Sequence, residues 1–325
     1  MEREKHLKVV VATLTRERPE MLKKLLFSWS NMALPPNIDA QCLVVENDDS
    51  PKSLLVVEAC STFANGLALK YVHETELGIP FARNRAAREA LESGADLLAF
   101  VDDDERVDSE WLVELVRTHR ETGAELIGGP VRVELGLADP SLTERMIFGS
   151  LEQRFRRKEN RACAKTRQGG TDGVTIVTSN WLARTGLFRD HGLWFDEKMR
   201  FTGGTDAKFY AEVREKGLKT AWSHKAIVYE EIPSGRLSLG YQFKRGRNQS
   251  SSAFHRKLMK NRLMALTLLV IVPFKLLAVV ALIVALPFTR GLTLADIART
   301  SGGLLGRFDA LLGRRSDLYE VVTGE

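Results

Sequence analysis

Short apolar runs alternate with stretches of helical character along about the first 130 residues of the chain. These runs predict strands that are buried on both faces of a sheet, at residues 8–13, 42–45, 67–72, 97–101 and 126–133. Apolar spacing, prolines and capping residues predict intervening helices that begin at Pro19, Pro51, Ile79 and Ser109. This alternation predicts an α/β fold with a mostly parallel sheet and helices on both faces.

The fourth apolar run, residues 97–101, is followed directly by four acidic residues, Asp102 to Glu105. We expect these carboxylates at the C-terminal edge of the sheet, where ligands bind in open α/β sheets. Adjacent like charges repel one another unless a cation or hydrogen bonds compensate them. The alternative is a solvated acidic loop in which Asp108 caps the next helix, which is the better interpretation of an isolated acidic run.

Polar residues also end the first two predicted strands, namely Thr13 in the first and Glu46 with Asn47 in the second. Together with Arg83, near the start of a helix, they are expected to converge with the acidic run on one rim of the sheet. This combination suits a nucleoside held by side chains and a diphosphate neutralised by a divalent cation and an arginine. The chain has neither G-x-G-x-x-G after its first strand nor G-x-x-x-x-G-K-[ST], so phosphate must be held in another way.

The second half begins near Gly136 and contains a basic run at residues 154–167. We interpret the basic run as a solvated, mobile loop, and contact with an anionic acceptor is the alternative. Residues 174–178 predict a strand that leads to Asn180. Two glycines then precede a helix through about residue 216, whose first turn contains Asp206.

A strongly apolar segment at residues 263–288 is interrupted by Pro273 and Lys275. Its length would allow a spanning helix, since about 20 residues cross a bilayer. Basic residues flank both ends, so the positive-inside rule does not assign the ends to opposite sides. We favour a hairpin or an interfacial pair of short helices, bent at Pro273 with both ends cytosolic. A buried helix of a soluble domain is the alternative.

The net charge of +5 suggests anionic partners, although its sign does not separate nucleic acid, nucleotide and anionic lipid. Three cysteines without metal-like spacing favour a reducing compartment. The first apolar run is too short for a signal peptide, so we expect the bulk of the chain in the cytosol.

Six short motifs occur in a specific order: Val-Ala-Thr at 11–13, Val-Val-Glu-Asn at 44–47, Gly-Ile-Pro-Phe-Ala-Arg-Asn at 78–84, Phe-Val-Asp-Asp-Asp-Glu at 100–105, Thr-Ser-Asn at 178–180 and Gly-Gly-Thr-Asp at 203–206. In this order they resemble the family 2 glycosyltransferases with the GT-A fold. The resemblance is greatest to enzymes that build bacterial exopolysaccharides of the succinoglycan type on a lipid carrier.

The resemblance implies a GT-A catalytic domain at residues 1–235, with a Rossmann-like nucleotide-sugar half at 1–135 and an acceptor half at 136–235. It is followed by a basic helical connector at 236–262, the membrane-embedded or interfacial segment at 263–288 and a basic cytosolic tail at 289–325.

The resemblance also implies a role for each candidate residue. Asp206 would be the general base, and Asp104 with Asp102 would bind Mn²⁺ or Mg²⁺. The nucleotide sugar would be contacted by Thr13, Glu46, Asn47, Arg83, Asp102, Asp103 and Asn180. Glu46 stands where the family usually has Asp, and Thr205 replaces the Glu of the family's Glu-Asp motif. A purely structural role is the alternative for Asp103.

Residues 242–246 resemble the Q-x-x-R-W motif of processive polysaccharide synthases, except that Gly246 replaces the tryptophan. We therefore predict transfer of a single sugar. Arg245 and Arg247 are predicted to hold the diphosphate of a lipid-linked acceptor, and a basic helix face near a membrane is the alternative.

The function implied by the resemblance is inverting, metal-dependent transfer from a nucleotide diphosphate sugar, with uridine and a hexose expected, to an oligosaccharide on a polyprenyl diphosphate. The enzyme would lie at the cytoplasmic face of the inner membrane, with no nucleic acid partner. One alternative is a non-catalytic membrane partner that retains the fold, an interpretation kept open by Thr205 and Glu46. A nucleotidyltransferase is disfavoured, because no glycine-rich loop with a lysine or arginine follows the first strand.

Overall fold

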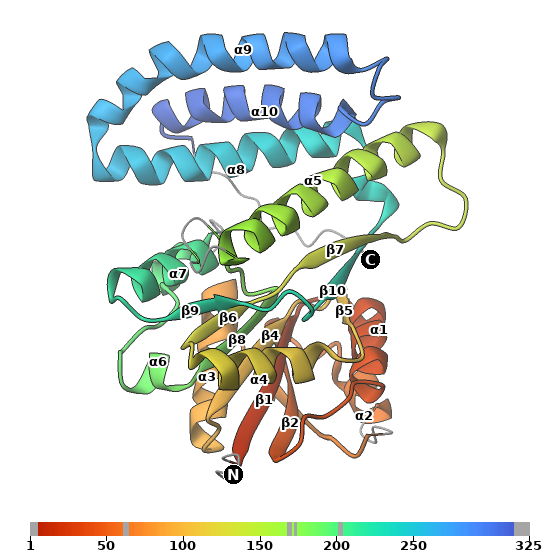
Figure 1. Ribbon diagram of the computed structural model, residues 1–325, viewed down its shortest axis with the longest axis vertical. Helices are drawn as coiled ribbons and strands as arrows, with labels where there is room; N and C mark the ends of the chain where they lie inside the picture. The colour runs from red at the N-terminus through yellow and green to blue at the C-terminus, as the bar shows by residue number, and fades with distance from the viewer. Residues whose placement is uncertain (1–5, 61–64, 168–170, 172–173, 201–203, 315–325) are drawn as a thin grey trace.

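The computed structural model describes residues 6–60, 65–167, 171, 174–200 and 204–314. Its central element is a seven-stranded sheet in the order β3-β2-β1-β4-β8-β6-β9 (Figure 1). The strands are β1 (Leu7–Thr15), β2 (Ile38–Glu46), β3 (Ala68–His73), β4 (Leu97–Val101), β6 (Leu126–Gly128), β8 (Asn180–Arg184) and β9 (Thr220–Trp222). Only β8 runs antiparallel to its neighbours in this sheet, so the described sheet is mostly parallel, which confirms the prediction.

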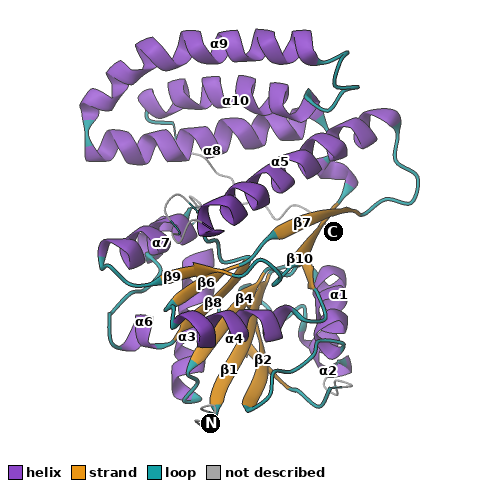
Figure 2. Cartoon of the chain, viewed as in Figure 1, coloured by secondary structure: helices purple, strands orange, loops and turns teal. Residues whose placement is uncertain are grey.

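Helices cover both faces of this sheet (Figure 2). One face carries α1 (Pro19–Ser30), α2 (Leu54–Ala59) and α4 (Trp111–Thr122); the other carries α3 (Ile79–Glu92), α6 (Gly186–Arg189) and α7 (Thr205–Glu215). Strand β1 contributes apolar side chains to both faces of the sheet. Val9 and Val11 join one hydrophobic core, and Val10 and Ala12 join the other. Successive side chains of a strand point to opposite faces, so a strand covered on both faces is apolar throughout.

A second, three-stranded sheet has the order β5-β10-β7 and consists of β5 (Glu105–Val107), β10 (Val228–Ile232) and β7 (Val131–Leu135). The single strand predicted at 126–133 is therefore wrong, because the chain divides it between β6 and β7. The division falls at Gly129 and Pro130, and proline has no N–H with which to continue a ladder.

Two further predictions in the second half are wrong. The basic run lies in α5 (Leu142–Arg167), a helix of 26 residues, and not in a loop. Its buried positions, among them Ile147 and Leu151, form a narrow apolar side that the many charges obscure. Residues 174–178 alternate in burial like a strand, but they pair with no strand of the described residues, and β8 begins only at Asn180.

The last part of the described chain forms a layer of helices above the C-terminal edge of the sheet (Figure 1). It contains α8 (Leu239–Lys260), α9 (Leu268–Ala285) and α10 (Leu294–Leu311), with a 3₁₀ helix at Arg262–Thr267 between α8 and α9. Two further 3₁₀ helices lie earlier in the chain, at Glu197–Met199 before α7 and at Ser234–Arg236 before α8. Helix α10 lies against α8 so closely that a Cβ atom built on Gly246 would be 2.3 Å from the carbonyl oxygen of Arg299. Gly302 and Gly306 meet the backbone of α8 at similar distances.

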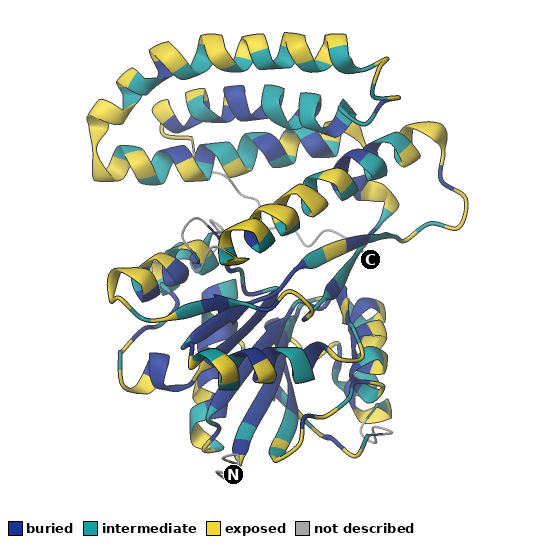
Figure 3. Cartoon of the chain, viewed as in Figure 1, coloured by how far each residue is buried: buried dark blue, intermediate teal, exposed yellow. Residues whose placement is uncertain are grey.

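Helix α9 is the outermost helix, and most of its side chains are exposed (Figure 3). It continues through Pro273, so the predicted bend into two short helices at this proline is wrong. A proline removes one helical hydrogen bond without necessarily ending the helix. Among the described residues, one helical segment, Arg262–Ala285, is long and apolar enough to cross a membrane, and 6% of its most apolar 18-residue stretch is buried. The helix predicted to begin at Pro51 is expected to end near Ala64, and this end lies outside the described residues. Gly203 and residues 315–325 of the tail also lie outside them.

Candidate active site

The acidic run opens onto a cavity of about 900 Å³, which we call the donor cavity. It lies between the C-terminal edge of the sheet, the start of α3, the start of α7 and the helices α5 and α8. Its size is in the range of ligand pockets. Arg83, Asp102, Asp104, Asp206 and Arg245 all line it, so residues predicted from distant parts of the sequence meet in one place.

Asp102 is the residue of the acidic run whose carboxylate has no bonded partner. Its backbone N–H donates to Glu105 Oε2 over 3.0 Å, but its carboxylate forms no hydrogen bond or ion pair with any described residue. Burial and the neighbouring charge of Asp104 raise the pKa of Asp102 to about 7, although Arg83 favours the ionised form. The ionised carboxylate therefore needs a further positive group.

Asp103 ties the acidic run to the end of β1. One carboxylate oxygen accepts from Thr15 Oγ1 at 2.9 Å, and the other accepts from Arg18 Nη1 at 3.0 Å. Burial raises the pKa of Asp103 to about 6, against the opposing effect of Arg18. These contacts favour the structural alternative for this residue.

Asp104 is paired with an arginine that the sequence analysis did not single out. Arg236 Nη2 donates to Asp104 Oδ2 over 2.9 Å, and Arg236 Nη1 donates to Glu230 Oε1 over 3.0 Å. Arg236 is buried, which opposes its charge, yet the two carboxylates hold its pKa above the ordinary value. The negative charge of Asp104 is thus already compensated within the protein.

Arg83 brings the start of α3 to the start of α7. Its Nη1 donates to Thr205 Oγ1 over 2.5 Å, and its guanidinium lies 5.3 Å from the ring centroid of Phe195. Thr205 is the first residue of α7 and Asp206 the second. Asp206 accepts from the N–H of Ala207 with Oδ1, while Oδ2 has no partner among the described residues. An oxygen of Asp206 is therefore available to accept a proton in the donor cavity.

The residues predicted at the ends of β1 and β2 lie behind the cavity wall, except Asn47. Thr13 is fully buried, and its hydroxyl has no hydrogen-bond partner in the described part of the chain. Glu46 accepts from the N–H and hydroxyl of Ser53 and from the hydroxyl of Tyr71. Asn47 lines the cavity, and its Oδ1 accepts from the N–H of Gly78 over 2.8 Å, which fixes the approach to α3.

Asn180 is held inside the fold, and its amide is fully bonded. Its Nδ2 donates to the carbonyl oxygens of Pro130 and Ala226, and its Oδ1 accepts from Trp111 Nε1 over 2.9 Å. These bonds join the beginning of β8 to the connections beside it. The neighbouring Ser179 lines the donor cavity, whereas Asn180 does not.

The two arginines predicted to bind the acceptor point to different places. Arg245 lines the donor cavity and donates to Tyr241 Oη over 3.0 Å. Arg247 forms a bidentate ion pair with Asp309 of α10, at 2.5 and 2.9 Å, and is not among the residues that line the cavity.

Sequence reasoning missed the three residues that hold the acidic run, namely Thr15, Arg18 and Arg236. The first two follow Thr13 closely, so the rule that strand ends meet at one edge could have found them. Arg236 follows β10, a strand that the pattern did not predict.

Asp102 and Asp104 are the residues that could hold a divalent cation here. No three His, Cys, Asp or Glu side chains of the described residues form a group that could hold a metal. A hard cation at this rim would therefore take most of its ligands from phosphate oxygens and water, as Mg²⁺ commonly does.

Comparisons with known proteins agree with this arrangement. A family model described as glycosyl transferase family 2 matches residues 9–190, a range that contains the acidic run and Arg83. The succinoglycan biosynthesis protein ExoM of Rhizobium meliloti is 31% identical over 239 residues, which cover 74% of this chain and 72% of that protein.

Two solved structures share the fold. The mannosyltransferase PcManGT of Pyrobaculum calidifontis, in complex with GDP-Man and Mn²⁺, superposes with a TM-score of 0.65 at 14% identity, covering 96% of this chain and 89% of its own. Residues 1–349 of TarS of S. aureus, in complex with UDP-GlcNAc, give a TM-score of 0.53 at 15% identity, covering 94% and 92%. At these identities the likeness concerns the fold alone.

Proposed function

The chain belongs to glycosyl transferase family 2 and has the GT-A fold, and from this premise we propose the reaction that it catalyses. Family membership makes it a nucleotide-sugar glycosyltransferase, and its similarity to a succinoglycan biosynthesis protein is our basis for assigning it to exopolysaccharide biosynthesis. The proposed reaction moves one sugar from a UDP-hexose to an oligosaccharide on a polyprenyl diphosphate, with inversion at the anomeric carbon. The observation that carries it is the convergence of Arg83, Asp102 and Asp206 on one cavity.

Asp206 is the proposed general base. Its Oδ2 accepts the proton of the acceptor hydroxyl while that oxygen attacks the anomeric carbon from the face opposite the nucleotide. Attack from that face inverts the configuration of the sugar. The guanidinium of Arg83, fixed by Thr205, faces the departing diphosphate and stabilises its growing negative charge.

Asp102 and Asp104 are the proposed ligands of Mn²⁺ or Mg²⁺. The fit rests on the Asp102 carboxylate, which has no partner among the described residues and whose pKa is raised by burial and by the charge of Asp104. When bound, such a cation would supply a counter-charge for the leaving diphosphate. Arg236 would then share Asp104 with the cation or release it.

Helix α9 is the proposed membrane segment, with the catalytic domain at the cytoplasmic face of the inner membrane. Its exposed apolar side chains include Leu269, Leu277 and Val284, and water is a poor environment for so many of them. Basic residues flank the segment on both sides, which favours the same compartment for both ends.

The test is an assay of the purified full chain against a panel of nucleotide sugars with lipid acceptor extracted from membranes. Asp206→Asn should lower turnover by about 10²- to 10⁴-fold, which is typical for loss of a general base. Asp102→Asn should abolish the metal dependence of transfer. Asp49→Asn, an exposed carboxylate near the second strand, is the matched control and should leave transfer unchanged. Full activity of both correctly folded site variants would show that the proposed mechanism is wrong.

A further inference from the structure

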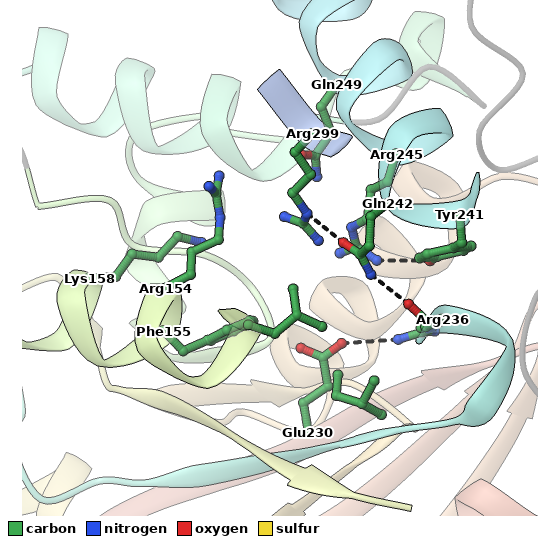
Figure 4. A pocket seen from close by; sticks show the side chains of 12 residues that line it. Arg154, Phe155, Lys158, Glu230, Arg236, Tyr241, Gln242, Arg245, Gln249 and Arg299 are labelled. Carbon is green, nitrogen blue, oxygen red and sulfur yellow. Dashed lines mark hydrogen bonds and ion pairs between the residues drawn. The ribbon is translucent and has the colours of Figure 1, made fainter. Parts of the chain in front are cut away.

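Beside the donor cavity lies a smaller pocket of about 70 Å³ between α5, α8 and α10, lined by five cationic side chains (Figure 4). One of them, Arg236, is paired with Asp104 and Glu230, and the other four converge from three helices. Arg154 and Lys158 come from α5, Arg245 from α8 and Arg299 from α10. We call this the basic pocket. Lys158 and Arg245 also line the donor cavity, so the two spaces adjoin.

The charges of the basic pocket are poorly compensated. Arg299 Nε donates to Gln242 Oε1 over 2.6 Å and Arg245 to Tyr241, and both of these partners are neutral. The ammonium of Lys158 lies 5.1 Å from the ring centroid of Phe155 and forms no ion pair with a described residue.

Arg154 alone among the four has a carboxylate partner within 4 Å in the described structure. That partner, Asp296, lies 3.5 Å away and is shared with Arg157 at 3.0 Å. Glu230 faces the pocket, but it is paired with Arg236. Glu230 acts on Arg245 and Lys158 without forming an ion pair with either, so the four cations depend on two carboxylates that are each shared with a further arginine.

Mutual repulsion contributes to a lowered pKa in two of the four cations, Arg299 and Lys158, whereas the pKa of Arg245, despite desolvation of its guanidinium, is held above its ordinary value by Tyr241 and Glu230. Burial and the charges of Arg154 and Arg245 lower the pKa of Arg299 to about 10. Lys158 reaches solvent, but partial desolvation of its ammonium and the charges of Arg154, Arg299 and Arg245 lower its pKa below the ordinary value. The Nε groups of Arg154 and Arg245 are buried and have no hydrogen-bond partner among the described residues. An anion in the pocket would relieve both the repulsion and the unmet donors.

Helix geometry explains how the basic run of α5 contributes. Arg154, Lys158 and Arg161 are spaced by four and three residues, so they lie along one face of the helix. The first two line the basic pocket, and Arg161 lines the donor cavity. Arg156 lies off this face and pairs with Glu152. These three side chains form a row of positive charge along the boundary between the basic pocket and the donor cavity.

We propose that the basic pocket binds the diphosphate of the lipid-linked acceptor and is an anion site separate from that of the donor. This inference rests on the proposed function and extends it to named residues. Arg299 belongs to α10, against which the exposed apolar helix α9 packs, so the pocket lies between the donor cavity and the lipid-facing helix. A diphosphate bound there leaves its lipid on the side of α9 and its glycan on the side of Asp206.

An ion pair separates the basic pocket from the rim that faces the donor's diphosphate. Arg236 contacts Asp104 on one side and Glu230 on the other, and Glu230 in turn interacts with Arg245 and Lys158. The donor rim has its own cation in Arg83. The four cations of the basic pocket are therefore a second group, beyond what one diphosphate at the rim requires.

The test is calorimetric titration of geranylgeranyl diphosphate in detergent micelles into the full chain saturated with UDP in Mg²⁺ buffer. The wild type should bind while UDP is present. Arg299→Gln and Lys158→Gln should each weaken this binding about tenfold, as expected for the loss of one charge-assisted hydrogen bond. UDP affinity should change less than twofold. Arg156→Gln, on the same helix but outside the pocket, is the matched control and should bind like the wild type.

Each contrary result has a distinct meaning. If saturating UDP prevents the lipid diphosphate from binding, or if both site variants bind it like the wild type, the second anion site is refuted. If inorganic pyrophosphate binds as tightly as the lipid diphosphate, or geranylgeraniol does, the lipid diphosphate assignment is overturned. Lys158→Gln, whose side chain reaches solvent, keeps the test valid should Arg299→Gln fail to fold. Absence of UDP binding in the wild type would instead contradict the proposed function, and lipid binding could still be measured without UDP.

Discussion

Asp102, Asp103 and Asp104 are adjacent in the sequence and have different partners in the structure. Their position could be predicted from the sequence, but their different roles could not. The apolar run before them was enough to predict their place at the edge of the sheet, because β4 is buried on both faces. The partners of the three carboxylates could not be predicted from the sequence. Asp102 faces the cavity without a partner, Asp103 is bonded to Thr15 and Arg18, and Asp104 is paired with Arg236. These differences depend on Arg18 and Arg236, whose positions follow from packing between distant segments.

The raised pKa values of Asp102 and Asp103, about 7 and about 6, predict a pH dependence. Because both lie above the unfolded value of about 3.9, the folded metal-free chain binds more protons, and its stability should fall as pH rises from about 4 to 7. A divalent cation binds the ionised carboxylates and should reverse this loss. The increase in melting temperature caused by Mn²⁺ should therefore be larger at pH 8 than at pH 6.

Differential scanning fluorimetry at the two pH values measures this effect. In Asp102→Asn, the increase in melting temperature caused by Mn²⁺ should be nearly the same at pH 6 and pH 8. An equal or larger stabilisation of the wild type by Mn²⁺ at pH 6 would contradict the prediction.

Arg236 relieves the repulsion between the carboxylates of Asp104 and Glu230, so its loss should destabilise the folded chain. Arg236→Gln leaves Glu230 without its ion-pair partner and leaves Asp104 with Arg18, at 3.6 Å, as its remaining one, and the free energy of unfolding should fall by about 3 kcal/mol, as for other broken buried pairs. Mn²⁺ should restore part of this stability, because it can neutralise Asp104. Urea denaturation with and without Mn²⁺ measures both effects. Arg106→Gln, which breaks an exposed pair with Glu134, is the control, and a similar loss in both variants would refute the special role of Arg236.

At the scale of elements, prediction succeeded for strands that are buried on both faces and failed for helices that bury only a narrow side. The strand predicted at 97–101 coincides with β4. Helix α5 was missed because only a thin side of it is buried, and its charges resemble those of a solvated loop. Residues 174–178 have the burial pattern of a strand without a partner, and pairing cannot be read from the pattern of a single segment.

The contact between α8 and α10 explains one departure from the processive motif. Gly246 stands where tryptophan would be, and a Cβ atom there would lie 2.3 Å from the carbonyl oxygen of Arg299. Gly246→Ala should therefore destabilise the chain by about 2 kcal/mol or more, since overpacking against backbone has no flexible neighbour to yield. Gly240→Ala, in the same helix with open space around it, should be neutral or slightly stabilising. Thermal unfolding of the two variants measures the difference, and equal melting temperatures would contradict this account.

At the scale of the whole molecule, the order of layers was only partly predictable. Alternation of strands and helices correctly indicated the sheet with its two helical faces. The apolar segment indicated a membrane element, which stays a prediction. The stacking of α5, α8 and α10 between the sheet and α9 was not predicted (Figure 1). Gly302 and Gly306 are four residues apart and so lie on one face of α10, which allows a close approach, but this spacing does not say which helix is approached.

The apolar surface of α9 should govern association with lipid. A charge in a membrane-embedded helix costs about 2.5–3.5 kcal/mol, so Leu277→Asp should lower partitioning into vesicles about a hundredfold. Leu55→Asp changes an equally exposed leucine on α2 and should leave partitioning unchanged. Flotation of the full chain with vesicles of zwitterionic and anionic lipid measures this. Equal flotation of the two variants would show that α9 is not the membrane segment.

The close stacking of α10 on α8 also has a consequence for acceptor length. Backbones that touch at Gly246, Gly302 and Gly306 leave the two helices little room to slide. If the proposed diphosphate is anchored at Arg299, the close packing of α10 on α8 would hold it in place relative to the donor cavity, which α8 lines, and the enzyme would then select its acceptor by length. Only glycans whose terminal hydroxyl spans the distance from the diphosphate to Asp206 would reach the carboxylate, which would limit each acceptor to one addition.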